Sequence, residues 1–303
     1  MMKAARLSGS SSRLLAGGIA TTMMLFASPA GQAESRPASI AVIAHRGGAL
    51  LRPENTVPAL RHAVELGAEV LEFDMMMTAD DKIVVHHDAD INRDVCKPDP
   101  GAKVMPGPIR GLSFAQIRRF DCGSGVRPSY AGKSFVAVPG ARIPSLDEVL
   151  RGFSDSEARF FAETKIPKGA DVDPVKFAMM LDAAVREHGL EDRLILQSFD
   201  FRTIDALHAI NPRIRTCLLG VPKLTREYLT MLRQHHATCI VLGHADIDKE
   251  GISALRQNGI TVFSNVADTA EDWRKYVDLG VDALFTNDPA RLIDFLRKSG
   301  LRR

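Results

Sequence analysis

The chain has 303 residues, of which 45% are hydrophobic and 25% are charged, as in ordinary globular proteins. A formal net charge of +2 excludes a polybasic nucleic-acid-binding protein, and a mean hydropathy of −0.05 excludes a protein with many membrane spans. Glycine and proline are spread along the chain without a repeat, so collagen-like and low-complexity chains are also excluded. Such a chain can build a sizeable hydrophobic core.

Residues 1–33 are predicted to be a secretory signal peptide. Three basic residues precede the apolar run 14–27, which is short for a membrane span, and small side chains follow at Gly31 and Ala33. Cleavage after Ala33 would remove three basic residues and no acidic one, which leaves 34–303 with a formal charge of −1. We therefore expect an exported protein, periplasmic or secreted, without a stable membrane span.

Export allows disulfides to persist. Cys96 and Cys122 lie in one loop-rich stretch, so a bridge between them is the first choice. Cys217 and Cys239 each follow a threonine and open an apolar run, which suggests equivalent positions on two strands. We expect these two to be small buried thiols and not a bridge.

Apolar strand-like runs alternate with segments of helical periodicity along most of the chain. The strand-like runs are 40–45, 70–77, 160–165, 194–199, 216–220, 239–243, 261–265 and 283–286. The helix-like segments include 57–66, 174–188, 202–209, 225–235, 249–257 and 270–279. Eight such units in about 250 residues predict a (β/α)₈ barrel, that is, a TIM barrel, in one domain over 34–303. An open, doubly wound sheet is the alternative, because a count of strands does not show closure.

The second strand is followed by a polar turn at 79–82 and another apolar run at 83–87. A turn this short cannot hold a crossover helix, so the two strands must form an antiparallel hairpin. If the turn is centred between Asp80 and Asp81, His87 lies directly opposite Asp74.

No clear strand–helix unit occurs in 89–142, which is rich in proline and glycine and has one plausible helix at 113–120. We interpret this stretch as a subdomain inserted after the hairpin, over one end of the barrel.

Charged and polar side chains at the ends of apolar strands are the candidates for chemistry. They are His45, Arg46, Glu72, Asp74, His87, Glu163 and Lys165. Three carboxylates offer only oxygen ligands, which suit Ca²⁺ or Mg²⁺, and packing them together without a cation would be costly. Arginine and lysine suit phosphate oxygens, and two histidines can share general acid and base catalysis. The set predicts a metal-assisted phosphodiester hydrolase.

Simpler interpretations exist for single members of this set. The carboxylates could pair with Arg46 and Lys165 in an ion-pair network, and Lys165 could simply neutralise Glu163. His86, adjacent to His87, faces the other way along a strand and is expected to be structural or exposed.

The motifs identify a family. The chain resembles the glycerophosphodiester phosphodiesterases over about 41–291, and the insertion resembles that of their exported bacterial members. The resemblance rests on AHRGGALLRPENTVPAL, GAEVLEFDMMMTADDKIVVHHD, IPSLDEVL, AETK, ILQSF and GVDALFTNDP. It implies an irregular (β/α)₈ barrel with an insertion on a hairpin, and a small-molecule glycerophosphodiester as substrate.

The resemblance also assigns roles. It implies that Glu72, Asp74 and Glu163 hold one divalent cation, that His45 and His87 form the acid–base pair, and that Arg46 contacts phosphate. Lys165 matches the lysine of the family's ExK pair. Glu54 matches a motif position of less settled role, and capping of the next helix by Asn55 or Thr56 would also explain this segment.

One departure concerns specificity. Many members carry a tryptophan in the strand that here reads TVFSNV, where this chain has Phe263. That aromatic wall touches the glycerol side of the substrate in the family, so Phe263 is a possible substrate contact. Two other functions stay open: a lysophospholipase D, whose apolar slot would come from 89–142, and a non-enzymatic organophosphate-binding protein.

Overall fold

The structure, a computed structural model, describes residues 39–132, 134–220, 227–243 and 248–302. The expected signal peptide at 1–33 lies outside these residues. Among the helices that the structure describes, none has the length and apolar character needed to cross a membrane.

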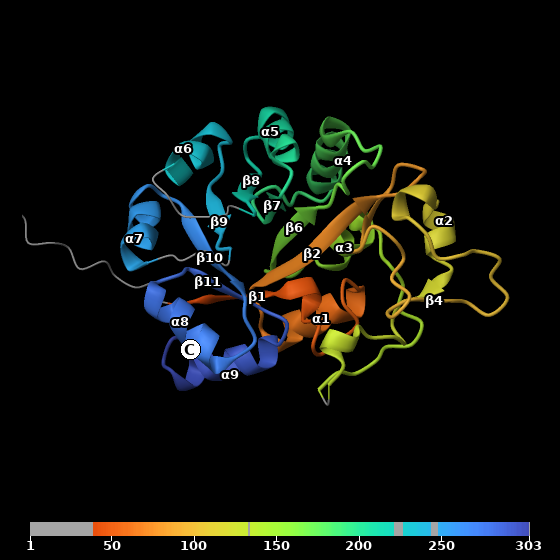
Figure 1. The fold of residues 1–303 in the computed structure, drawn as a ribbon, viewed down its shortest axis with the longest axis horizontal. Coiled ribbons are helices and arrows are strands. Elements are labelled where there is room, and N and C mark those ends of the chain that lie inside the picture. Colours follow the sequence, from red (N-terminus) through yellow and green to blue (C-terminus); the bar gives the residue numbers. More distant parts are fainter. Residues whose placement is uncertain (1–38, 133, 221–226, 244–247, 303) are drawn as a thin grey trace, which may run out of the picture. The chain divides into compact units, whose positions relative to one another are not determined.

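Within the described residues, eight parallel strands form a closed barrel (Figure 1). The strands are β1 (Ala41–Ala44), β2 (Val70–Met77), β6 (Arg159–Thr164), β7 (Leu194–Ser198), β8 (Arg215–Leu218), β9 (Cys239–Val241), β10 (Thr261–Val266) and β11 (Ala283–Thr286). Neighbours in this series pair with one another, and β1 pairs with both β2 and β11, which closes the ring. The barrel prediction is confirmed, and the open-sheet alternative is wrong.

Helices surround the barrel and cover its outer face (Figure 1). They are α1 (Val57–Leu66), α3 (Leu146–Gly152), α4 (Pro174–Glu187), α5 (Phe201–Ile210), α6 (Glu227–Gln234), α7 (Lys249–Gln257), α8 (Ala270–Leu279) and α9 (Pro289–Lys298). Their ends follow from the sequence: at α1 the Thr56 side chain accepts from the Ala59 N–H, and Gly67 ends the helix in the left-handed conformation. Thr269 and Gly280 bound α8 in the same way.

The strands are buried on both faces, which explains why they are nearly continuous apolar runs. One face packs against the helices, and the other fills the barrel interior with residues such as Ile43, Phe161 and Phe285. Charged side chains on such strands are therefore exceptions, and they mark the site described below.

Two cysteine predictions have opposite outcomes. Cys96 and Cys122 form the expected disulfide. Cys217 and Cys239 are also joined, so the prediction of two separate thiols is wrong. Strands β8 and β9 are neighbours, and their register sets Cys217 beside Cys239 with the Cα atoms 4.6 Å apart inside the barrel. Sequence periodicity gives the face of each strand but not this register.

The hairpin of β2 and β3 (Ile83–Val85) is antiparallel as expected, but its predicted register is wrong by one residue. Met75 pairs with Val85, and the His86 N–H donates to the Asp74 carbonyl at 2.9 Å. The loop has three residues between Thr78 and Lys82, not two, and Asp81 takes a positive φ of 54°. His86, and not His87, therefore lies opposite Asp74.

The insertion lies beside β2 and α3, outside the ring of barrel helices (Figure 1). Its elements are β4 (Lys97–Pro98), η2 (Ile109–Gly111), α2 (Phe114–Ile117), β5 (Phe120–Asp121) and η3 (Pro128–Tyr130). It has a small apolar core of its own, which includes the Cys96–Cys122 bridge. Helix α2 is shorter than the predicted 113–120, because Phe120 already pairs with Pro98 in a two-stranded sheet.

Candidate active site

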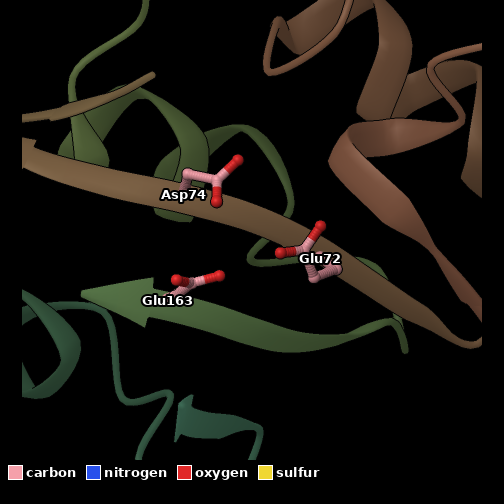
Figure 2. Close-up of side chains that lie close together, drawn as sticks. All are labelled: Glu72, Asp74 and Glu163. Atoms are coloured by element: carbon pink, nitrogen blue, oxygen red, sulfur yellow. The ribbon is translucent and has the colours of Figure 1, made fainter. Parts of the chain in front are cut away.

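Three carboxylates converge inside the barrel at its carboxyl-terminal end. Glu72 and Asp74 project from β2, and Glu163 projects from β6 toward them (Figure 2). One oxygen from each lies within 4.8 Å of the others, and all three side chains are buried. The register pairs Asp74 with Glu163 on adjacent strands, which explains why residues far apart in sequence meet.

A tight turn after β1 places Arg46 next to these carboxylates. This residue has a φ of 52°, and the glycine that follows has a φ of 79°. A Cβ atom on Gly47 would lie 2.9 Å from the Ala59 backbone, so only glycine lets α1 pack this closely. The turn directs the Arg46 N–H to Glu72 Oε2 at 2.7 Å, and its Nε lies 3.3 Å from Asp74 Oδ2.

Of the three carboxylates, Asp74 has the most cationic and hydrogen-bonding partners. Lys165 Nζ lies 3.3 Å from Asp74 Oδ1 and 2.6 Å from Glu163 Oε1. Asn55 donates its side-chain amide to Asp74 Oδ2 at 2.8 Å and accepts from the Asp74 N–H. Burial alone would raise the pKa of Asp74, but Lys165 and Arg46 hold that pKa well below its usual range.

At Glu72 and Glu163, neighbouring cations and hydrogen bonds offset the cost of a buried negative charge only in part. Burial, together with Asp74 and Glu163, raises the pKa of Glu72 well above its usual value. Burial and Asp74 raise the pKa of Glu163 to about 7, although Lys165 opposes this. Among the described residues, no lysine or arginine side-chain nitrogen lies within 4.0 Å of a Glu72 oxygen. An oxygen-only donor set with excess negative charge fits a hard divalent cation such as Ca²⁺ or Mg²⁺.

His45 stands beside this cluster with a neutral partner. Its Nδ1 lies 2.7 Å from Asn287 Oδ1, and its Nε2 lies 3.9 Å from Glu72 Oε2. The Asp268 carboxylate accepts hydrogen bonds from both the backbone and the side-chain amide of Asn287. Burial and the nearby Arg46 cation lower the pKa of His45 to about 4, so its ring is neutral at pH 7.

His87 has a charged partner instead. Its Nδ1 lies 2.7 Å from Asp88 Oδ1, and its side chain is 29% exposed. Both His87 and His45 lie close enough to interact with Asp74, which places both histidines around the carboxylates. His86 is buried, and its ring nitrogen contacts the Asp90 carbonyl at 3.1 Å, in agreement with the expected structural role.

A cavity of about 860 Å³ opens at this end of the barrel. His87, Glu163 and Lys165 lie in its wall, and apolar residues continue it along the loop after β6. The exposed ring of Phe199 lies at its edge, with Lys165 Nζ 5.8 Å from the ring centre. The cavity wall thus combines titratable and apolar side chains, and a small molecule could contact both.

Comparison with known proteins shows which family this chain belongs to. The model of the glycerophosphoryl diester phosphodiesterase family matches residues 45–291. The chain belongs to this family. It is an enzyme, a phosphoric diester hydrolase that acts on glycerophosphodiesters. This excludes the interpretation as a pure organophosphate-binding protein.

Individual relatives cover nearly the whole domain. A glycerophosphodiester phosphodiesterase from Caldanaerobacter subterraneus subsp. tengcongensis is 29% identical over 86% of this chain and 98% of its own length. A lysophospholipase D from Mus musculus is 25% identical over 84% of this chain and 85% of its own.

Solved structures share the fold. A putative glycerophosphoryl diester phosphodiesterase from Silicibacter pomeroyi superposes with a TM-score of 0.77 at 23% identity, covering 88% of this chain and 96% of that one. A phosphodiesterase from Oleispira antarctica, solved with the product sn-glycerol-3-phosphate, has a TM-score of 0.71 at 22% identity, covering 86% and 97%.

The two remaining residues that the sequence suggested for the site of this phosphodiesterase, Glu54 and Phe263, lie in different surroundings. Glu54 is buried beside Arg46, with Oε1 3.3 Å from Arg46 Nη1, and Thr56 rather than Glu54 or Asn55 caps α1. Phe263 is buried inside the barrel and packs edge-on against Phe161, with ring centres 5.2 Å apart. The structure thus brings Glu54 into the cluster but places Phe263 with the apolar interior residues.

Sequence reasoning missed the side chains that hold the others in place. These are Asn55, Asp88, Arg127, Gln197 and Asn287. Gln197 and Asn287 lie at strand ends within ILQSF and GVDALFTNDP, so a search for polar residues at every strand end would have found them. Arg127 lies in the insertion and carries no such signal.

Cation binding should compete with protons for Glu72 and Glu163. Because their pKa values are raised, these groups in the cation-free protein favour the folded state at low pH, and that stabilisation falls as the pH rises through about 7. We expect Ca²⁺ or Mg²⁺ to raise the melting temperature more at about pH 8 than at about pH 5.5. Glu163→Gln should abolish most of the difference. An equal increment at both pH values would contradict this account.

Proposed function

We propose that this phosphodiesterase depends on a divalent cation and hydrolyses glycerophosphodiesters to sn-glycerol 3-phosphate and an alcohol, with two histidines as base and acid. The observation that carries the proposal is the cluster of three buried carboxylates flanked by two histidines with unlike partners. The Oleispira antarctica structure holds the same product on the same fold, which supports the choice of product.

Glu72, Asp74 and Glu163 would hold the cation. When bound, it would supply Lewis-acid stabilisation of the negative charge on the phosphoryl oxygens. Arg46 and Lys165 would bind the same phosphate through charge-assisted hydrogen bonds. Arg46 Nε is buried 3.3 Å from Asp74 Oδ2 without a hydrogen bond, so this guanidinium has a donor that is not used in the structure.

His45 is assigned as the base because of the orientation of Asn287. A carboxylate accepts but does not donate, so Asp268 fixes the Asn287 amide with Nδ2 toward itself and Oδ1 toward His45. His45 Nδ1 must then carry the proton, and Nε2 keeps a free lone pair. The neutral ring takes the proton of the attacking hydroxyl, whether from water or from the 2-hydroxyl of glycerol.

His87 is assigned as the acid because its partner is the Asp88 carboxylate. The carboxylate accepts the Nδ1 proton and orients the ring, so that Nε2 can deliver a proton to the departing alcohol. His87 lies in the cavity wall, so the alcohol would occupy that cavity.

Replacement of His87 tests this assignment. His87→Ala should lower kcat for glycerophosphocholine at least about 100-fold, because an acid–base group is lost. Release of sn-glycerol 3-phosphate is the measurement, and His62→Ala, on the outside of α1, is the control expected to stay near the wild-type rate. A near-normal rate for His87→Ala would remove this residue from the mechanism.

A second candidate substrate is a lysophospholipid. The cavity has an apolar wall that includes Met76, Ile166, Val172 and Phe199, and a relative is a lysophospholipase D. Contrary to the sequence expectation, this wall comes mainly from the loops after β6 and β7, with only Ala89 from 89–142.

A direct comparison of substrates decides between the two. We expect faster release of choline from glycerophosphocholine than from lysophosphatidylcholine, because charged side chains such as Lys168, Asp200 and Arg202 interrupt the apolar wall that an acyl chain would need. The opposite order, measured below the critical micelle concentration of the lysolipid, would establish a lysophospholipase D.

We also propose that residues 1–33 direct export. The two cysteine pairs of the structure support an oxidising compartment. Expressed in a bacterium with this segment, the protein should be found outside the cytoplasm and begin at Glu34. An intact N-terminus in the cytoplasmic fraction, determined by peptide sequencing, would contradict export.

A further inference from the structure

One arginine of the insertion reaches the catalytic end of the barrel. We propose that Arg127 is a positioning residue that holds Asp88, and through it His87, ready to protonate the leaving alcohol. The inference rests on the proposed function, in which His87 is the acid. It gives the insertion a part in the reaction, although the insertion lies outside the barrel.

The contacts of Arg127 are short and divided between two carboxylates. Arg127 Nη2 lies 2.6 Å from Asp88 Oδ2, and Arg127 Nε lies 2.6 Å from Glu54 Oε2. The Arg127 side chain is only 19% exposed, so these pairs are poorly screened by solvent. Both carboxylates also contact a residue of the proposed mechanism, Asp88 with His87 and Glu54 with Arg46.

The two oxygens of Asp88 have separate partners. Oδ2 accepts from Arg127 and from the Asn92 side-chain amide, whereas Oδ1 contacts His87 Nδ1. With Oδ2 held from two sides, the carboxylate cannot rotate freely, and Oδ1 is kept in the plane that His87 needs. Such a partner fixes both the tautomer and the direction of the imidazole ring.

A disulfide and close backbone packing restrict the segment of the insertion that carries Arg127. The Cys96–Cys122 bridge joins the segment that follows Asn92 to the segment that precedes Arg127. Between bridge and arginine, Gly125 packs so tightly that a Cβ atom there would collide with the carbonyl oxygens of Asp94 and Val95. The residues that hold Asp88 therefore come from two chain segments locked together by a covalent bond and by backbone packing.

A purely structural role for Arg127 makes a different prediction from a positioning role. If Arg127 only attached the insertion to the barrel, its loss would affect all substrates alike. If it acts through His87, its loss should matter mainly when the departing alcohol needs a proton, and the part that passes through Glu54 to Arg46 should be small. Choline requires protonation as it leaves, whereas p-nitrophenol departs readily as the anion.

The experiment compares these two leaving groups. For Arg127→Met we expect kcat for glycerophosphocholine to fall about 10- to 100-fold, and kcat for the p-nitrophenyl ester of glycerol 3-phosphate to fall less than about 3-fold. The matched control is Arg142→Met, which breaks a 2.6 Å ion pair with Asp99 in the same insertion, a pair that includes neither Asp88 nor Glu54. It should leave both rates unchanged.

Arg127→Lys and His87→Ala complete the set. Arg127→Lys keeps the charge if the methionine variant folds poorly, but it cannot hold both carboxylates as a fork, so a smaller loss with the same leaving-group dependence is expected. Equal losses on both esters, or no loss, in the Arg127 variants would overturn the inference. If His87→Ala shows the leaving-group dependence and the Arg127 variants do not, only this inference fails. If His87→Ala also lacks it, the acid assignment fails as well.

Discussion

Burial of three carboxylates within a few ångströms of one another is the constraint on which this site depends. Each loses hydration, and each repels the others, so the fold must supply compensating charge and hydrogen bonds. Arg46 and Lys165 compensate Asp74, while Gln197 and the Arg46 backbone supply hydrogen bonds to Glu72. These contacts do not fully offset burial and mutual repulsion, and the pKa values of Glu72 and Glu163 are raised as a result. A divalent cation is the natural way to complete the compensation.

The two histidines differ in their partners, and the proposed base and acid roles rest on this difference. Burial keeps His45 neutral, and the Asn287 amide, oriented by Asp268, sets which of its ring nitrogens carries the proton. His87 instead pairs with the Asp88 carboxylate. Two titratable groups in unlike surroundings are a recurring basis for acid and base roles. The partners lie on different parts of the chain, one at the end of β11 and one at the start of the insertion.

Local patterns in the sequence predicted most of the fold and the core of the site. Strand periodicity and strand-end position were enough to bring Glu72, Asp74 and Glu163 together, because the carboxyl ends of parallel strands meet at one end of a barrel. The errors concern relations between segments. The register at His87 depended on a three-residue turn that composition does not reveal, and the Cys217–Cys239 pair depended on the register of β8 against β9. Arg127 belongs to an irregular loop, where no periodicity indicates direction.

The most direct test of the account is release of sn-glycerol 3-phosphate from glycerophosphocholine by the chain 34–303, before and after treatment with a chelator. We predict that the chelator abolishes release, that Ca²⁺ or Mg²⁺ restores it, and that Glu72→Gln cannot be restored by either ion. Undiminished turnover in the chelated protein would contradict the central claim that these carboxylates act by holding a cation.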